Sequence, residues 1–150
     1  MAERVQFELV TPERLLLSEM VEMVVVPGTE GNFGVLPGHA PLISSIRPGT
    51  IDVYEAQTIT RRIFVVSGIA EVTPQRCTVL ADEAMAPDSL DRAAIEAELQ
   101  TAEGNLASLR EHLGRAAGPE RDRLAAELRQ LERQVSVARA KLQALAEISR

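Results

Sequence analysis

The sequence predicts a β plus α protein, in which an N-terminal antiparallel β-sandwich or barrel precedes a C-terminal antiparallel two-helix hairpin. Three observations predict this fold: period-2 alternation in the first half, heptad spacing in the second, and a composition change near Pro87. All 4 aromatic residues, 6 of the 9 glycines and 6 of the 8 prolines precede Pro87, whereas strong helix formers dominate after it. We therefore expect a β domain at residues 1–86 and a helical domain at residues 87–150.

The first domain reads as short strands separated by turns. Val5, Phe7 and Leu9 alternate with polar residues, which is the period of a half-buried strand. Residues 20–26 form a second, more continuously apolar run that Pro27-Gly28 closes. Further strands are expected at residues 50–54, 58–66, 69–73 and 77–81, joined by hairpin-sized connectors.

The second domain reads as two helices. Apolar residues that step by four and three positions run from 95 to 113 and again from 124 to 145. The break between the two seams ends in Gly118-Pro119, which suits a helix cap and a first-turn position. Because each of two isolated helices buries only one face, we expect a marginally stable hairpin unless it docks on a further surface.

Composition excludes several classes of protein. The 150 residues carry 16 basic and 22 acidic side chains, a net charge of −6 with no basic run, which argues against a nucleic-acid partner. Residues 1–86 contribute 6 bases and 11 acids, or −5, and residues 87–150 contribute 10 and 11, or −1. One cysteine, Cys77, rules out a disulfide framework and is expected as a small apolar strand residue. No apolar run approaches the roughly 20 residues that span a bilayer.

The residue types form no recognisable catalytic or metal-binding pattern. Only His39, His112 and Cys77 offer nitrogen or sulfur ligands, and none belongs to a paired motif. The sequence has no Gly-x-Ser-x-Gly elbow. The glycines of residues 28–34 are spaced by three, unlike a phosphate-binding loop, and the only lysine is the distant Lys141. We therefore expect no catalytic residue, no metal and no cofactor.

The most unusual segment, residues 27–42, holds 4 glycines and 3 prolines together with several apolar side chains. Such a segment is expected to be an ordered, turn-rich connection that is available for partner contact. It closely resembles the signature of the epsilon subunit of F-type rotary ATP synthases, which is called delta in mitochondria. The signature reads Gly-x-Glu-Gly-x-x-Gly-apolar-x-Pro-Gly-His-Ala-Pro-Leu, and residues 28–42 match every named place. Shorter resemblances occur at residues 47–49, 67–72 and 78–82, with departures at Ser67 and Ile69.

The resemblance implies a sandwich of about ten strands, two C-terminal helices and a non-catalytic rotor subunit of the central stalk. Such a subunit couples rotation of the c-subunit ring to the catalytic hexamer through the gamma subunit. It would be peripheral to the cytoplasmic face of a bacterial inner membrane. Candidate contacts with the ring or gamma are Glu30, Asn32, Phe33 and His39. For His39 we expect structural hydrogen bonding ahead of direct contact.

The resemblance further implies that the hairpin can extend along gamma toward the alpha/beta hexamer and inhibit ATP hydrolysis. The candidate contacts for this state are Arg115, Arg121, Arg123, Arg129 and Arg133. The alternative interpretation is a solvated basic face with intrahelical partners such as Glu120, Glu127 and Glu132.

Some family members bind ATP through an Ile/Leu-Asp-x-x-Arg-Ala motif at the start of the first helix. Leu90 and Asp91 match it, but Ala94 stands where the arginine belongs. Arg92 lies two residues earlier, roughly 200° around a helix, so it cannot substitute. We expect weak or absent ATP binding, and Leu90 and Asp91 also suit a helix start.

The alternative function is a soluble coiled-coil or nucleotide-sensing regulatory module of another assembly. An acidic hairpin tip would favour it, but residues 114–123 are of mixed charge.

Overall fold

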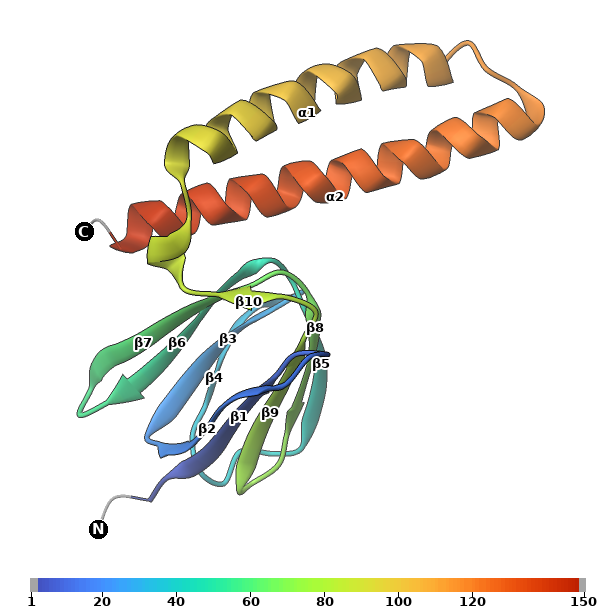
Figure 1. The fold of residues 1–150 in the computed structure, drawn as a ribbon. Helices are drawn as coiled ribbons and strands as arrows, with labels where there is room; N and C mark the ends of the chain where they lie inside the picture. Colours follow the sequence, from blue (N-terminus) through green and yellow to red (C-terminus); the bar gives the residue numbers. More distant parts are fainter. Residues whose placement is uncertain (1–2, 149–150) are drawn as a thin grey trace. The chain divides into compact units, whose positions relative to one another are not determined.

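The computed structural model describes residues 3–148, which form two compact units with a boundary between Ser89 and Leu90 (Figure 1). The first unit contains strands β1 (Val5–Val10), β2 (Leu15–Val21), β3 (Met23–Gly28), β4 (Gly31–Val35), β5 (Leu42–Ile46), β6 (Gly49–Glu55), β7 (Thr58–Val65), β8 (Gly68–Val72), β9 (Arg76–Ala81) and β10 (Ala84–Met85), and the short 3-10 helix η1 (Pro87–Ser89). The second unit contains helices α1 (Arg92–Leu113) and α2 (Gly118–Ile148). No helix within residues 3–148 is long and apolar enough to cross a bilayer.

The strands follow one hydrogen-bonded path in the order β10-β7-β6-β3-β5-β8-β9-β1-β2, with β4 paired to β3 beside it. A single residue pair, Gly28 with Ile46, joins β3 to β5. The path bends there, so β10, β7, β6, β3 and β4 form one layer and the remaining strands form the other (Figure 1). Only β1 and β9 run parallel among the described pairs. The predicted antiparallel sandwich is confirmed, with this one parallel pair added.

Period-2 alternation places apolar side chains between the two layers. Val5, Phe7 and Leu9 of β1 are buried, as their spacing predicts. Both layers contribute to one core, which consists of Val5, Phe7, Leu9, Val21, Val24, Val26, Val35, Ile46, Ile51, Val53, Val65, Ala70, Val72, Cys77, Val79 and Ala81. Each large side chain buried in this way contributes roughly 1.5–3 kcal/mol relative to an exposed one. The sandwich therefore has an apolar core of its own.

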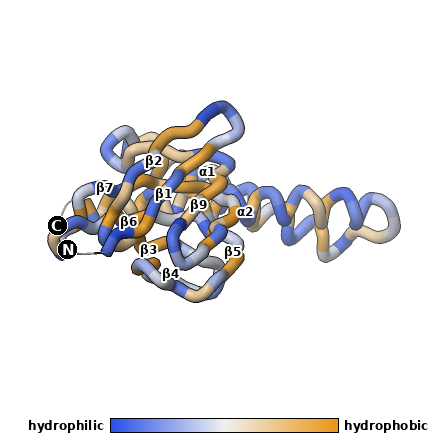
Figure 2. Tube along the Cα trace, turned by 90° about the horizontal axis from the view of Figure 1, so that it is seen from below, coloured by the Kyte–Doolittle hydropathy of each residue, from blue (hydrophilic) through white to orange (hydrophobic). Residues whose placement is uncertain are grey.

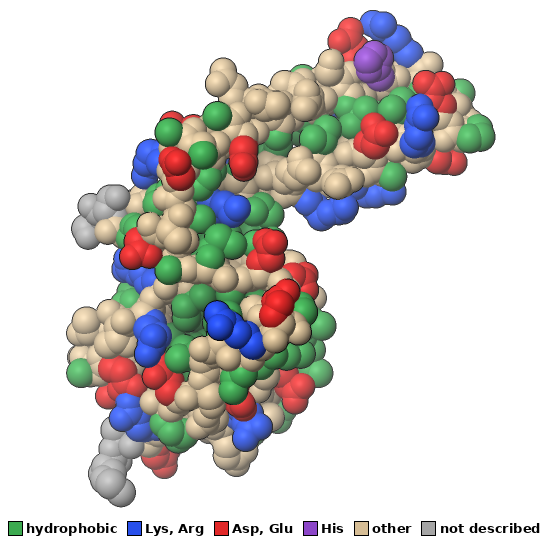
Figure 3. Space-filling model, viewed as in Figure 1, with side chains coloured by type: hydrophobic (Ala, Val, Ile, Leu, Met, Phe, Trp, Pro, Cys, Tyr) green, Lys and Arg blue, Asp and Glu red, His purple; other side chains and the backbone are tan. Residues whose placement is uncertain are grey.

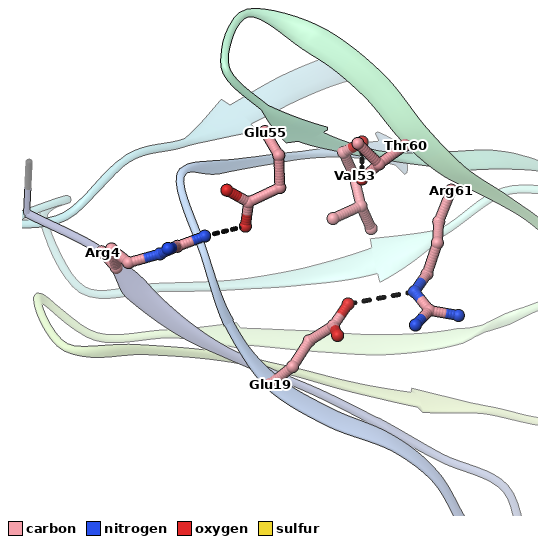
Figure 4. A network of polar contacts seen from close by, with 6 residues as sticks. All are labelled: Arg4, Glu19, Val53, Glu55, Thr60 and Arg61. Atoms are coloured by element: carbon pink, nitrogen blue, oxygen red, sulfur yellow. Dashed lines mark hydrogen bonds and ion pairs between the residues drawn. The ribbon is translucent and has the colours of Figure 1, made fainter.

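Two ion pairs connect the layers on the side where the strand path has its ends (Figure 4). Arg4, just before β1, pairs with Glu55 of β6, and Arg61 Nε of β7 lies 3.0 Å from Oε1 of Glu19 in β2. The end strands β2 and β10 do not pair with each other, so the barrel is left open. Exposed ion pairs of this kind contribute about 0–1 kcal/mol each. The fold is thus a sandwich rather than a closed barrel.

The structure divides the first half more finely than the sequence predicts. The apolar run of residues 20–26 is not one strand, because β2 ends at Val21 and β3 begins at Met23. At Glu22 the chain turns a corner, because β2 pairs with β1 in one layer and β3 pairs with β6 in the other. Apolar residues continue on both sides of this corner. The segment of residues 27–42 likewise contains a strand, β4, which pairs with β3.

The helical unit has the predicted heptad seams. The buried residues of α1 are Ile95, Ala102, Leu106 and Leu109, and those of α2 are Val135, Ala138, Ala144 and Leu145. Apolar and polar positions alternate turn by turn along the pair (Figure 2). Gly114 caps α1, and Gly118, with φ of 64°, begins α2 at the predicted break. Ala144 lies outside the predicted seam and outside both interhelical clusters.

Candidate partner-binding site

A tight turn between β3 and β4 presents the centre of the glycine-rich segment. Pro27 pairs with Asn32 and Gly28 with Gly31, which leaves Thr29 and Glu30 as a two-residue connection. Gly31 has φ of 132°, a conformation that side chains rarely adopt. At Gly28 an added Cβ would lie 2.9 Å from both the Gly31 carbonyl oxygen and the Phe33 ring. The glycines therefore allow a compact turn with Glu30 exposed at its tip.

The four residues predicted as ring or gamma contacts do not lie together. Glu30 and Asn32 are exposed at the turn, whereas half-buried Phe33 packs against the sandwich core. His39 comes four residues after Val35, the far end of β4, and this five-residue strand alone spans about 14 Å from Gly31. Its Nδ1 donates a hydrogen bond to the Ala40 carbonyl at 2.7 Å. Only Glu30 and Asn32 remain as neighbours on one exposed surface.

The loop that carries His39 is held at the opposite end of the sandwich. The Gly38 amide donates to the Pro74 carbonyl at 2.7 Å, and the His39 amide donates to the Leu36 carbonyl at 3.2 Å. The first bond ties the loop to the turn between β8 and β9, and the second closes a turn within residues 36–39. The β4 strand therefore separates two contact regions that the sequence analysis treated as one.

An exposed row of apolar side chains crosses the outer face of the second layer. Ile69 pairs with Leu80, Leu80 with Val10, and Val10 with Leu15. Ile69, Leu80 and Leu15 are 48%, 51% and 53% exposed, respectively. Four adjacent strands place these side chains over roughly 14 Å. We call Val10, Leu15, Ile69 and Leu80 the apolar row, and apolar side chains reach the sandwich surface among charged ones in Figure 3.

The apolar row was missed by the sequence analysis, although a signal was present. In β8, Ala70 and Val72 point into the core, so Ile69 is apolar at an outward position. In β9, Cys77, Val79 and Ala81 are buried, so Leu80 breaks the alternation in the same way. An outward apolar residue on one strand is ordinary. Only the register shows that such residues on neighbouring strands form a continuous row.

Ser45 connects the apolar row to the β3–β4 turn. It pairs with Ile69 across β5 and β8, and its carbonyl accepts a hydrogen bond from the Thr29 amide at 3.0 Å. The row and the turn therefore lie at the same end of the sandwich. This end combines an apolar surface with an exposed polar tip, which is a composition typical of protein–protein contacts.

The five arginines predicted as inhibitory contacts fall into two groups. Arg115 pairs with Glu111 at 3.0 Å, and Arg121 donates to the Leu113 carbonyl at 3.0 Å, which ties α2 to the end of α1. Within residues 3–148 no ion pair involves the other three, which are Arg123, Arg129 and Arg133. Acidic and basic side chains are interspersed over the hairpin tip (Figure 3).

The start of α1 is built as a helix cap. Asp91 has an extended backbone, and its carboxylate accepts a hydrogen bond from the Ala94 amide at 3.3 Å. Leu90 packs against the apolar cluster that contains Ile95 and Leu145. Ala94 offers no donor that replaces the arginine of the ATP motif, and the Asp91 carboxylate is already engaged. These contacts account for Leu90 and Asp91 as residues of a helix start, and weak or absent ATP binding stays a prediction.

No catalytic arrangement was found among the described residues. A hollow of about 230 Å³ is lined by Arg61 and by apolar side chains of β1, β2, β7 and β10. Within residues 3–148 no three His, Cys, Asp or Glu side chains are placed to hold a metal ion. Cys77 is buried in β9, and burial raises the pKa of its thiol to about 12, so it is not a nucleophile at neutral pH.

Comparisons with known proteins agree with this architecture. The family model described as "ATP synthase, Delta/Epsilon chain, beta-sandwich domain" matches residues 4–87. The ATP synthase epsilon chain of Rhodospirillum rubrum is 60% identical over 106 residues, covering 71% of this chain and 79% of the relative. That of Rhodospirillum centenum is 59% identical over 104 residues, covering 66% of this chain and 71% of the relative. A chain in a cryo-EM structure of Euglena gracilis mitochondrial ATP synthase has the same fold, with a TM-score of 0.75. The two sequences are 20% identical, and the match covers 95% of this chain and 81% of that chain.

The chain therefore belongs to the delta/epsilon family of ATP synthase subunits. Within that family, the curated relatives named above are epsilon chains, so the chain is a non-catalytic subunit of the complex. The predicted family, fold and non-catalytic role are confirmed. The alternative of a regulatory module for another assembly is not favoured.

Proposed function

We propose that this subunit acts in the rotor of the ATP synthase, where its sandwich links the gamma subunit to the c-subunit ring. We assign this linking role to residues 1–86 and a regulatory role to the hairpin of residues 87–150. The subunit would be peripheral to the cytoplasmic face of a bacterial inner membrane. The observation that carries this proposal is the placement of the apolar row and the β3–β4 turn at one end of the sandwich.

Gamma is proposed to cover the apolar row. An apolar strip on a sheet face is stabilised when another protein removes it from water, at about 25 cal/mol per Å² of buried apolar surface. The row stands on strands that the sandwich core and the sheet ladder hold rigid, so docking requires little ordering of this chain. Ile69 and Leu80, which are paired across the adjacent strands β8 and β9 and are each about half exposed, are the expected main residues of this contact.

The c-subunit ring is proposed to meet the β3–β4 turn. Glu30 is exposed at the tip, and no ion pair within residues 3–148 involves it. Its carboxylate is therefore available to a basic or hydrogen-bonding group of the ring. His39 and Phe33 are assigned structural roles instead, because His39 bonds a neighbouring carbonyl and Phe33 packs on the core.

The gamma contact is tested by co-purification of the full-length chain with tagged gamma. Wild-type protein is expected to bind, and Ile69→Asp to weaken binding at least about tenfold, because a buried unpaired carboxylate is costly. Met20→Asp is the matched control, since Met20 is 50% exposed on the edge strand β2 at the other end of β1. Equal binding by the Ile69 and Met20 variants, or no binding by wild type, would contradict the proposal.

The hairpin is proposed to restrain ATP hydrolysis when it extends toward the alpha/beta hexamer. Arg129 and Arg133 are four residues apart on α2, so two like charges lie on one side of the helix, and within residues 3–148 no ion pair involves either of them. An acidic partner surface would relieve this repulsion. Arg115 and Arg121 are not expected to contribute as much, because their guanidinium groups already hold Glu111 and the Leu113 carbonyl.

Two changes test this regulatory role in a reconstituted complex. Truncation after Ser89 is expected to raise the rate of ATP hydrolysis, and Arg129→Ala with Arg133→Ala to raise it in part. Arg139→Ala is the control for loss of charge, because Arg139 instead pairs with Glu103 of α1 at 3.4 Å. Hydrolysis that the truncation leaves unchanged would rule out inhibition by the hairpin.

A further inference from the structure

Arg47 holds both strands of the β3–β4 hairpin from outside it. Arg47 follows β5 directly, and its amide donates to the Pro27 carbonyl of β3 at 3.0 Å. Its Nη2 donates to Oδ1 of Asn32 in β4 at 2.6 Å. Pro27 and Asn32 are themselves paired across the hairpin, so Arg47 contacts both members of a cross-strand pair next to the turn.

One terminal nitrogen of the Arg47 guanidinium group is buried, whereas the other bonds Asn32 at the surface. The buried Nη1 has almost no solvent-accessible surface and has no hydrogen-bond acceptor among the described residues. Gly49 leaves space beside it, since an added Cβ there would lie 3.6 Å from Nη1 and 2.9 Å from the Pro27 Cβ. A buried donor without an acceptor is unfavourable. The side chain is nevertheless kept in this position, where its remaining polar contact is Asn32.

We propose that Arg47 is the positioning residue of the β3–β4 turn. Through Asn32 it fixes the orientation in which Glu30 meets the c-subunit ring, so this inference rests on the ring contact of the proposed function. Neither Arg47 nor the side chain of Asn32 needs to touch the ring. The amide of Asn32 serves as the attachment point of the turn, which differs from the direct contact that the sequence analysis expected of it.

Arginine suits this role better than lysine. A planar guanidinium directs its N–H groups in a fixed fork, so a hydrogen bond to Asn32 also sets the angle of the hairpin. A lysine ammonium on a flexible stem would keep the charge but would hold the angle less well. Arg47→Lys is therefore expected to retain folding and gamma binding while it loosens the turn.

The test is a double-mutant cycle in the full-length chain with Arg47→Met, Asn32→Leu and both together. Binding to detergent-solubilised c-ring and amide hydrogen exchange of residues 29–33 are measured for each protein. Each single variant is expected to weaken ring binding about tenfold and to speed exchange, because each removes the same charge-assisted hydrogen bond. The double variant should be no worse than either one, since the two residues act through one contact.

Asn32→Asp is the rescue variant, because an aspartate still accepts from Arg47 and should keep wild-type exchange and ring binding. Unchanged gamma affinity in all variants would show that the sandwich remains folded. Normal exchange in Arg47→Met, or normal ring binding in Asn32→Leu beside a loss in Arg47→Met, would overturn the proposal. If the wild-type chain does not bind the ring, the ring contact of the proposed function fails, while exchange in the same variants still decides whether Arg47 positions the turn.

Discussion

Position 68 requires a glycine because β8 and β9 approach each other closely there. Its φ is 146°, and an added Cβ would lie 2.0 Å from the Leu80 carbonyl oxygen. Both the backbone angle and the close approach of β9 exclude a side chain. The position begins β8 beside the apolar row, so the surface proposed to bind gamma depends on it.

Gly68→Ala is expected to lower the free energy of unfolding by about 2–4 kcal/mol, as strained backbone and overpacking add. Gly38→Ala is the matched control, because Gly38 also has a positive φ, of 83°, but has no atom within 4 Å of an added Cβ. Gly38→Ala should lower the free energy of unfolding by only about 1 kcal/mol, through backbone strain alone. Urea unfolding of the two variants measures the difference, and equal losses would show that the contact with Leu80 is unimportant.

The buried thiol of Cys77 is expected to make the sandwich less stable at alkaline pH. Burial raises the pKa of this thiol from 9.0 to about 12, so the folded chain keeps a proton that the unfolded chain loses. The free energy of unfolding should therefore fall above pH 9, by up to about 1.4 kcal/mol per pH unit, until the folded thiol also ionises. Cys77→Ala should remove this part of the pH slope in urea unfolding. A slope that persists unchanged in the variant would assign it to other groups.

At the level of secondary-structure elements, α1 begins at a cap formed by Asp91, and we expect no ATP binding there. Asp91→Ala should destabilise the hairpin by about 1 kcal/mol through loss of the hydrogen bond to the Ala94 amide, and Asp91→Ser should retain most of it. Calorimetric titration should detect no ATP binding to any of the three proteins. Micromolar ATP affinity in the wild-type chain that Asp91→Ala abolishes would contradict the assignment of Asp91 to capping.

The elements that the sequence predicted well are the helices and strands whose apolar residues recur with a regular period. The seams of α1 and α2 and the alternation of β1 are all present. The corner at Glu22 was missed because Val21 and Met23 keep the run apolar on both sides of it. Strand β4 was missed because its two glycines and the turn beside it resemble a loop until pairing with β3 is known.

At the level of the whole molecule, the sequence motif indicated the family but not the arrangement of the contact residues. Glu30 and His39 are nine positions apart in the motif, yet β4 places them at opposite ends of a strand. The apolar row and the Arg47–Asn32 bond join residues that are distant in the chain. Only strand register brings them together, and no local period encodes that register.

The central claim is that this chain couples the ring to the catalytic hexamer without catalysing a reaction itself. ATP-driven proton pumping in inverted membrane vesicles that lack only this subunit tests it most directly. Adding the purified full-length chain should restore the protons pumped per ATP hydrolysed, and Ile69→Asp should fail to restore them at the same concentration. Pumping that is already complete without the chain, or that the chain does not change, would contradict the account.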